Sequence, residues 1–141
     1  LKPGEGNVGK KPSAYSHIVA FSPVGKSVLS GVYDGSLRLW GVTAGREIRK
    51  FIGHTGRVES VAFSPDGRYI LTGSWDNRAR LWNRQGKTLR VFKGHKDDVI
   101  AVAFSPDGKY ILTGSWDNCA RLWDLQGEMI QEISGHRGGV Y

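Results

Sequence analysis

The sequence is poor in cysteine and in long apolar runs, and both shortages limit the classes of protein to which it can belong. It holds one cysteine, Cys119, in 141 residues, so it can form no internal disulfide and no cysteine-based zinc site. The longest apolar run, Val99–Phe104, is far shorter than the roughly 18 residues of a membrane-spanning helix. We therefore expect a soluble protein without covalent or metal staples, no membrane contact, and a reducing, cytoplasmic location.

Catalytic and cofactor motifs are also missing from the sequence. It contains no phosphate-binding loop, no dinucleotide fingerprint and no cluster of residues spaced for a metal ion. Cys119 has no base near it in sequence, which favours an inert thiol, and His17 has no paired ligand, which favours a surface residue over a metal site. We therefore expect no cofactor, no metal and no enzymatic activity.

Glycine, in contrast, is abundant, and several glycines mark an internal repeat. Glycine accounts for 20 of the 141 residues, about twice its usual share of roughly 7%. Gly-His pairs recur every 41 residues, at Gly53-His54, Gly94-His95 and Gly135-His136. The segment Val61–Trp82 matches Val102–Trp123 at all but two of 22 positions. These two segments are therefore recent copies of one unit.

Turn signals divide each unit into four short strand patterns. In the second unit the predicted strands and turns are Val58–Ser64, the turn Pro65–Gly67, Tyr69–Ser74, the turn Asp76-Asn77, Ala79–Trp82, the turn Arg84–Gly86 and Thr88–Lys93. Four strands in 41 residues leave no room for a helix. The unit is therefore predicted to be an antiparallel meander.

These motifs resemble those of the WD-repeat (Trp-Asp repeat, G-protein-beta-like) β-propeller family. The Gly-His pair, the Ser-Pro-Asp-Gly turn, the Gly-Ser-Trp-Asp segment and the Leu-Trp pair recur in register in two full units, and the match covers roughly residues 15–141. The first unit departs from the pattern at Pro12, Val24 and Gly41, and the second at Asn83, which replaces the closing aspartate. The resemblance implies an all-β fold, a β-propeller of four-stranded antiparallel blades.

The resemblance also implies a division of the chain into blades. We expect a linker at 1–14, a degenerate blade at 15–52, full blades at 53–93 and 94–134, and the start of a further blade at 135–141. Because the linker begins with neither an initiator methionine nor a signal peptide, we expect a piece of a larger multidomain protein. Three blades are fewer than the roughly four to eight that close a ring. Closure therefore needs further blades from the same chain or self-assembly, and an open arc exposes two apolar faces.

One recurring set of polar residues allows two interpretations. A histidine, a hydroxyl and a carboxylate suggest a hydrolase triad, but these residues recur once per unit, as a structural hydrogen-bond network would. The resemblance implies that they join the Gly-His loop to the second and third strands. The predicted network consists of His54, Thr72, Asp76 and Trp82, their counterparts His95, Thr113, Asp117 and Trp123, and the remnant Ser30, Asp34 and Trp40 in the first unit. We expect the first blade to be the least well held.

A second set of residues is predicted to bind a partner. By resemblance these residues lie at the rim of the face where propellers commonly receive partners, and tryptophan, tyrosine and arginine are enriched in binding hot spots. The predicted residues are Trp75, Trp116, Tyr33, Arg57, Glu59, Asp98, Ile100, Tyr15 and His17. Simple duplication and packing between blades would also account for the paired tryptophans, and both interpretations stay open.

Charge is distributed unevenly along the chain. The net charge of +7 is the sum of +5 over residues 1–52, +5 over 53–93 and −3 over 94–141. Basic units can bind nucleic acid or another polyanion, yet lysine and arginine on an outer strand also prevent edge-to-edge aggregation. The basic residues on or near the predicted outer strand of the second unit are Arg84, Lys87, Arg90 and Lys93.

The sequence as a whole predicts a non-catalytic scaffold that binds a protein or peptide partner on the propeller face. The alternative is nucleic-acid or other polyanion binding through the basic first two blades. That alternative is the weaker, because protection of the outer strand explains the same charges.

Overall fold

Three four-stranded antiparallel sheets make up the described part of the chain. The computed structural model describes residues 16–23, 25–32, 34–43 and 45–134, so the predicted linker at 1–14 and the predicted blade start at 135–141 lie outside the described residues. Blade 1 consists of β1 (Ser16–Phe21), β2 (Ser27–Val32), β3 (Leu37–Gly41) and β4 (Glu47–Phe51). Blade 2 consists of β5 (Val58–Phe63), β6 (Tyr69–Ser74), β7 (Ala79–Asn83) and β8 (Thr88–Phe92). Blade 3 consists of β9 (Val99–Phe104), β10 (Tyr110–Ser115), β11 (Ala120–Asp124) and β12 (Met129–Ile133).

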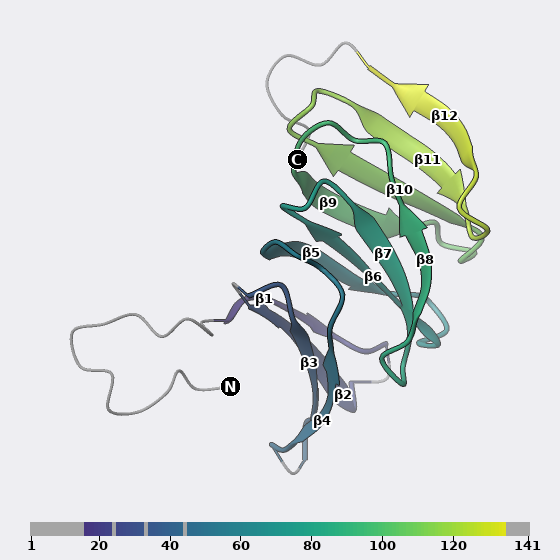
Figure 1. The fold of residues 1–141 in the computed structure, drawn as a ribbon. Helices are drawn as coiled ribbons and strands as arrows, with labels where there is room; N and C mark the ends of the chain where they lie inside the picture. The colour runs from purple at the N-terminus through teal and green to yellow at the C-terminus, as the bar shows by residue number, and fades with distance from the viewer. Residues whose placement is uncertain (1–15, 24, 33, 44, 135–141) are drawn as a thin grey trace.

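The predicted all-β class and four-stranded meander are confirmed. Within each sheet the strands follow chain order, and the three sheets form an arc that does not close into a ring (Figure 1). In blade 2 three predicted strand ends differ from the observed ones by one residue, since β5 ends at Phe63, β7 at Asn83 and β8 at Phe92. The described residues contain no helix long and apolar enough to cross a membrane.

The Ser-Pro-Asp-Gly segment makes the sharp reversal between β5 and β6. Ser64 Oγ donates a hydrogen bond to Asp66 Oδ1 at 2.7 Å and accepts one from the Tyr69 N–H at 2.9 Å. Gly67 closes the turn at a φ of 74°, in the left-handed region that favours glycine. The turn before β10 repeats these bonds from Ser105. A short polar segment therefore fixes the register of each hairpin.

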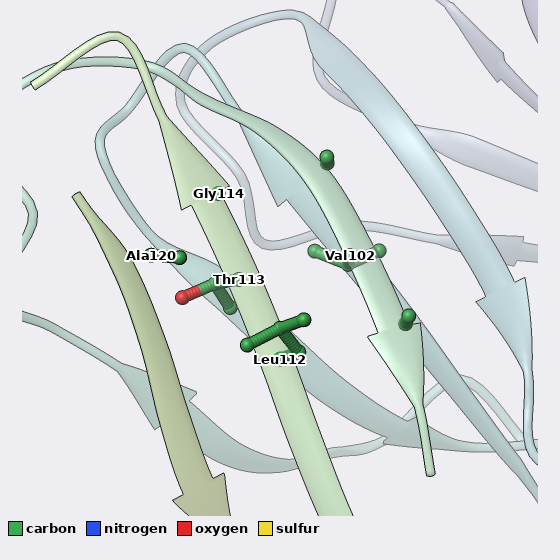
Figure 2. A pocket seen from close by; sticks show the side chains of 7 residues that line it. Val102, Leu112, Thr113, Gly114 and Ala120 are labelled. Atoms are coloured by element: carbon green, nitrogen blue, oxygen red, sulfur yellow. The ribbon is translucent and has the colours of Figure 1, made fainter. Parts of the chain in front are cut away.

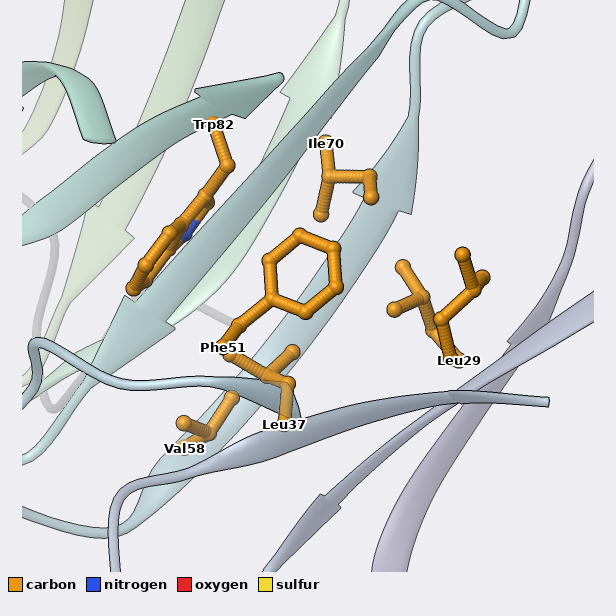
Figure 3. Packing of buried hydrophobic residues seen from close by; sticks show 7 residues of the cluster. Leu29, Leu37, Phe51, Val58, Ile70 and Trp82 are labelled. Carbon is orange, nitrogen blue, oxygen red and sulfur yellow. The ribbon is translucent and has the colours of Figure 1, made fainter. Parts of the chain in front are cut away.

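The hydrophobic core lies between the blades rather than within them. Two clusters of buried side chains fill the junctions of blades 1 and 2 and of blades 2 and 3. At the first junction the Phe51 ring meets the Trp82 ring edge-on, with 5.6 Å between centroids (Figure 3). At the second junction Phe92 meets Trp123 in the same way at 5.3 Å. Each blade is thus stabilised by burial of its face against its neighbour.

The two end blades keep apolar side chains in solvent. In blade 1 the side chains of Val19 and Phe21 are 60% and 70% exposed. In blade 3 Leu112 is 41% exposed, although its counterpart Leu71 is fully buried at the junction with blade 3. A shallow hollow beside Leu112 runs over β9, β10 and β11 (Figure 2). That further blades or self-assembly cover these faces stays a prediction.

Candidate functional site

The Gly-His loop of blade 2 is tied to its sheet by a chain of buried hydrogen bonds. His54 Nδ1 lies 2.7 Å from Asp76 Oδ2, and His54 Nε2 lies 2.6 Å from Thr72 Oγ1. The Trp82 Nε1–H donates to the same Thr72 oxygen at 2.9 Å. An ionised carboxylate only accepts and an indole N–H only donates, so a neutral histidine protonated at Nδ1 satisfies every atom.

Blade 3 repeats this arrangement almost atom for atom. His95 lies 2.8 Å from Asp117 and 2.7 Å from Thr113, whose hydroxyl accepts from the Trp123 indole at 3.0 Å. A single catalytic centre would not be built twice at fixed offsets. The Thr113 hydroxyl is also fully buried, so a substrate cannot reach it. The geometry therefore favours the structural interpretation over the hydrolase triad.

Blade 1 holds only a fragment of the network. The Trp40 indole donates to Ser30 Oγ at 2.9 Å, while the Asp34 carboxylate turns to Ser36, accepting from its N–H at 3.0 Å and its hydroxyl at 2.6 Å. Pro12, at the position of the histidine, lies outside the described residues. The three predicted residues of this blade are thus not joined to one another in one chain.

The electrostatics of the network follow from burial and from its hydrogen bonds. Burial lowers the pKa of His54 below its ordinary value, and it outweighs the opposite effect of the Asp76 carboxylate. Burial acts in the other direction on Asp76, but hydrogen bonds from His54 and from the Thr55 and Arg78 N–H groups outweigh it and lower the pKa of this carboxyl. A neutral histidine beside an ionised aspartate therefore holds the loop at neutral pH.

These pKa shifts predict that acid destabilises the fold. As pH falls below 6.5, the ordinary pKa of histidine, His54 takes up a proton in the unfolded chain but not yet in the folded chain. The stability that is present above pH 6.5 is therefore lost as the pH falls from 6.5 towards the lower pKa of the folded state. Asp76 adds stability that is present above 3.8 and is lost below it. We expect urea midpoints to change little from pH 7.5 to pH 6.5 and then to fall towards pH 5, and to fall less in His54→Gln. Equal midpoints across this range would contradict the assigned protonation.

The histidine networks position an exposed rim of the arc, here called the tryptophan rim. It consists of the loops that precede β5 and β9 and of the β6–β7 and β10–β11 turns. Ser74 Oγ donates to the Gly56 carbonyl at 2.9 Å, and the Thr55 N–H donates to Asp76 at 3.1 Å. Loop and turn are therefore held together from both sides, which gives the rim a rigid backbone.

Three of the predicted binding residues meet on blade 2. Trp75 is 45% exposed, and the Arg57 guanidinium lies over its ring at 4.9 Å from the centroid. Glu59 accepts from the Trp75 indole at 3.4 Å and pairs with Arg57 at 3.7 Å. The Trp75 N–H also donates to the Arg57 carbonyl at 2.9 Å. Sequence reasoning thus selected residues that the fold brings into one cluster.

Blade 3 keeps the same backbone at the rim and changes the side chains. The Trp116 N–H donates to the Asp98 carbonyl at 3.1 Å, and Trp116 is 41% exposed. Ile100 stands at the position of Glu59, so this part of the rim is less polar. Burial, followed by the charges of Asp97 and Glu59, raises the pKa of Asp98. The carboxylates of Glu59 in blade 2 and Asp98 in blade 3 therefore repel each other across the blade junction.

A β-bulge lies at the same place in each innermost strand. The pairing of β1 with β2, of β5 with β6 and of β9 with β10 shifts register, and the bulges fall at His17, Glu59 and Ile100. A bulge re-aims a side chain, and these three positions were selected from sequence only by their distance from the histidine. Of the remaining predicted residues, Tyr15 and Tyr33 lie outside the described residues.

Sequence reasoning missed why the Gly-His pair needs its glycine. A Cβ on Gly53 would lie 2.7 Å from Arg80 Nη1 and 2.9 Å from the Trp82 ring, so the side chains of β7 close over this position. It also missed Asp97, which adds a second carboxylate beside Asp98. Asp97 could have been found because it is next to Asp98 in sequence, whereas nothing in the local sequence indicated the contact of Arg80 with Gly53.

Of the two isolated candidates, Cys119 and His17, only the cysteine has a described side chain. Burial and then Glu132 raise the pKa of the Cys119 thiol, which keeps it protonated at neutral pH. No group of three histidine, cysteine, aspartate or glutamate residues in the described ranges could hold a metal ion. The side chain of His17 is not described, so its predicted role stays a prediction.

A comparison with models of known protein families identifies the family of this chain. The model of the family described as WD domain, G-beta repeat matches residues 16–41, 45–83 and 86–124, which is well over half of the chain. The chain belongs to this WD-repeat family. WD repeats generally form non-catalytic scaffolds for protein interaction. A comparison with curated proteins gives no match.

The WD-repeat matches are out of phase with the sheets. The match at 45–83 joins β4, the outer strand of blade 1, to β5, β6 and β7 of blade 2. One sequence repeat therefore spans a blade junction, including Phe51 and Trp82, which pack against each other there. One WD-repeat unit therefore supplies three strands of one blade and the contact of that blade with the outer strand of its neighbour.

Proposed function

We propose that this WD-repeat chain is a non-catalytic scaffold that binds a protein or peptide partner through its tryptophan rim. The observation that carries the proposal is the pair of exposed indoles, Trp75 and Trp116, at equivalent places on two blades. Exposed tryptophan on a preorganised backbone gives large contact area at a small entropic cost. The buried histidine networks supply that preorganisation.

The neighbours of the two indoles give the rim a mixed chemistry. Arg57 and Glu59 are already arranged around Trp75, while Asp98 and Ile100 hold the equivalent sequence positions in blade 3. A partner would therefore meet apolar area ringed by charge, which is the usual anatomy of a specific interface. The identical tryptophans also agree with duplication, so substitution is needed to separate binding from copying.

The test uses peptides selected from a random library on the folded 141-residue chain. Affinity of the best peptide is measured by fluorescence anisotropy for the chain and for the double variant Trp75→Ala with Trp116→Ala. Loss of two anchor residues is expected to weaken binding at least about thirtyfold. The circular dichroism spectrum is expected to stay unchanged, because both side chains are exposed.

Tyr110 offers a matched control for this experiment. Its side chain is 41% exposed, the same as that of Trp116, but it begins β10 and so lies at the opposite end of the sheet. Tyr110→Ala is expected to leave peptide affinity within about twofold. Retained affinity in the double tryptophan variant, or an equal loss in Tyr110→Ala, would remove the binding function from this rim.

A further inference from the structure

A hollow on the rim opposite the tryptophans gathers three cationic side chains. It has a volume of about 310 Å³ and lies where the β1–β2, β5–β6 and β7–β8 turns of blades 1 and 2 meet. Its charged lining residues are Lys26, Arg68, Arg84 and Asp66. These residues come from three separate turns, so the hollow exists only because the two blades pack against each other.

Arg84 is fixed in the wall of this hollow. Its Nη1 donates to the Gly67 carbonyl at 3.3 Å, and its Nη2 donates to Ser27 Oγ, on blade 1, at 3.2 Å. The guanidinium also lies 5.7 Å from the centroid of the Phe63 ring. These contacts use two of the five N–H groups of the guanidinium. Arg84 was expected from sequence to protect an outer strand, but the structure shows it bridging two blades.

The charge of the hollow is net positive. Among the described residues that line it, Asp66 is the one carboxylate, and that group accepts from Ser64 Oγ at 2.7 Å and from the Arg68 N–H at 3.0 Å. The hydrogen bond from Ser64, followed by that from Arg68, lowers the pKa of Asp66 and keeps it ionised. Three cations against one anion leave an excess of two positive charges. Asp66 repels an anionic ligand, and the three cations must outweigh that repulsion.

The next junction provides an internal comparison. The equivalent hollow between blades 2 and 3 is smaller, at about 180 Å³, and its charged lining residues are Asp66 and Asp107. Leu125 occupies the position that Arg84 occupies in the first hollow. At the second junction Arg68 and Lys109 hold the sequence positions of Lys26 and Arg68, although neither lines the hollow there. The charge that separates the two junctions in sequence is that of Arg84, which Leu125 replaces.

We propose that the hollow between blades 1 and 2 binds a phosphate group, either as inorganic phosphate or as a phosphomonoester. A guanidinium offers paired N–H donors that match phosphate oxygens, and lysine adds a point charge. The site goes beyond the proposed scaffold function, because it lies on the opposite rim and uses none of the same residues. A scaffold built this way takes a partner on one rim and a phosphate on the other.

The test measures binding of sodium phosphate, and separately of O-phosphoserine, by calorimetry at constant ionic strength. Arg84→Leu gives this hollow the residue of the second hollow, and we expect it to weaken binding at least about tenfold. Lys87→Leu removes the same charge from an exposed neighbour in the same turn, and its binding is expected to stay within about twofold. Arg84→Lys, which keeps the charge and loses the fork, is expected to fall between them.

Several outcomes would overturn the proposal. Absence of phosphate binding by the unaltered chain is one, and an equal loss in Lys87→Leu and Arg84→Leu is another, since it would indicate diffuse attraction. Binding of a DNA oligonucleotide that falls steeply with salt and ignores Arg84→Leu, without phosphate binding, would replace it with polyanion binding. If phosphate and phosphoserine bind equally, the phosphate group alone is recognised, whereas tighter phosphoserine binding identifies a phosphomonoester ligand. Unchanged peptide affinity at the tryptophan rim in Arg84→Leu separates this test from that of the scaffold function.

Discussion

Replacing Trp82 with alanine is expected to lower the free energy of unfolding by about 3–5 kcal/mol, the range for large aromatic side chains in a core. Trp82 is fully buried at the junction of blades 1 and 2, where its ring meets Phe51 and His54. Its indole N–H also donates a hydrogen bond to Thr72 Oγ1. The substitution therefore opens a cavity between two blades and leaves a buried hydroxyl without a donor.

Trp40 is the matched control for this prediction, since it holds the same position in blade 1. It also donates to a hydroxyl, that of Ser30, but it is only partly buried because no described blade covers its face. Trp40→Ala is expected to cost less than half as much. Trp82→Phe, which keeps most of the ring and loses the donor, keeps the comparison measurable by urea unfolding if Trp82→Ala does not fold. Equal losses at Trp40 and Trp82 would show that packing between blades does not dominate stability.

Gly35→Ala is expected to cost about 2–4 kcal/mol, through backbone strain and overlap together. Gly35 has a φ of 85°, and a Cβ there would lie 2.6 Å from the His54 carbonyl oxygen and 2.7 Å from that of Gly56. Asn77, at the equivalent place in blade 2, carries a side chain at a φ of 68°. A positive φ alone is thus tolerated in this turn. The larger part of the expected loss at Gly35 therefore comes from the close approach of blade 1 to the next Gly-His loop.

Gly25→Ala separates strain from overlap. Gly25 has a φ of 72°, but nothing lies within 4 Å of the position of a Cβ. Strain alone predicts a loss of about 1–2 kcal/mol. Thermal unfolding of both variants decides the matter, and a loss at Gly35 no larger than that at Gly25 would mean that the loop yields easily and that blade 1 is loosely docked.

Much of the fold could be predicted from sequence because its determinants are local. The Ser-Pro-Asp-Gly turn, with Ser64 and Asp66 bonded across it, fixes one hairpin within a few residues. The turn signals that divide each unit into four short strands, and the recurrence of the Gly-His and Trp positions, supplied the rest. The histidine network was also within reach, because a set that repeats at fixed offsets, such as His54 and His95, indicates structure rather than a single catalytic centre.

What sequence reasoning missed depends on contacts between turns that lie far apart in the chain. Arg84 reaches Ser27, 57 residues away, and no local pattern predicts that bond. The influence of Glu59 on Asp98 likewise crosses from blade 2 to blade 3. From sequence, Arg84 was assigned to protection of an outer strand, and its difference from Leu125 gained a meaning only when the two junctions could be compared.

The most direct test of the scaffold function is hydrogen–deuterium exchange of the chain with and without a selected peptide. Exchange reports local protection along the backbone, so it locates the binding surface without any substitution. We expect protection to concentrate at residues 55–59, 74–77, 96–100 and 115–118, which form the tryptophan rim. Protection confined to the opposite rim, at residues 64–68 and 105–109, would contradict the account.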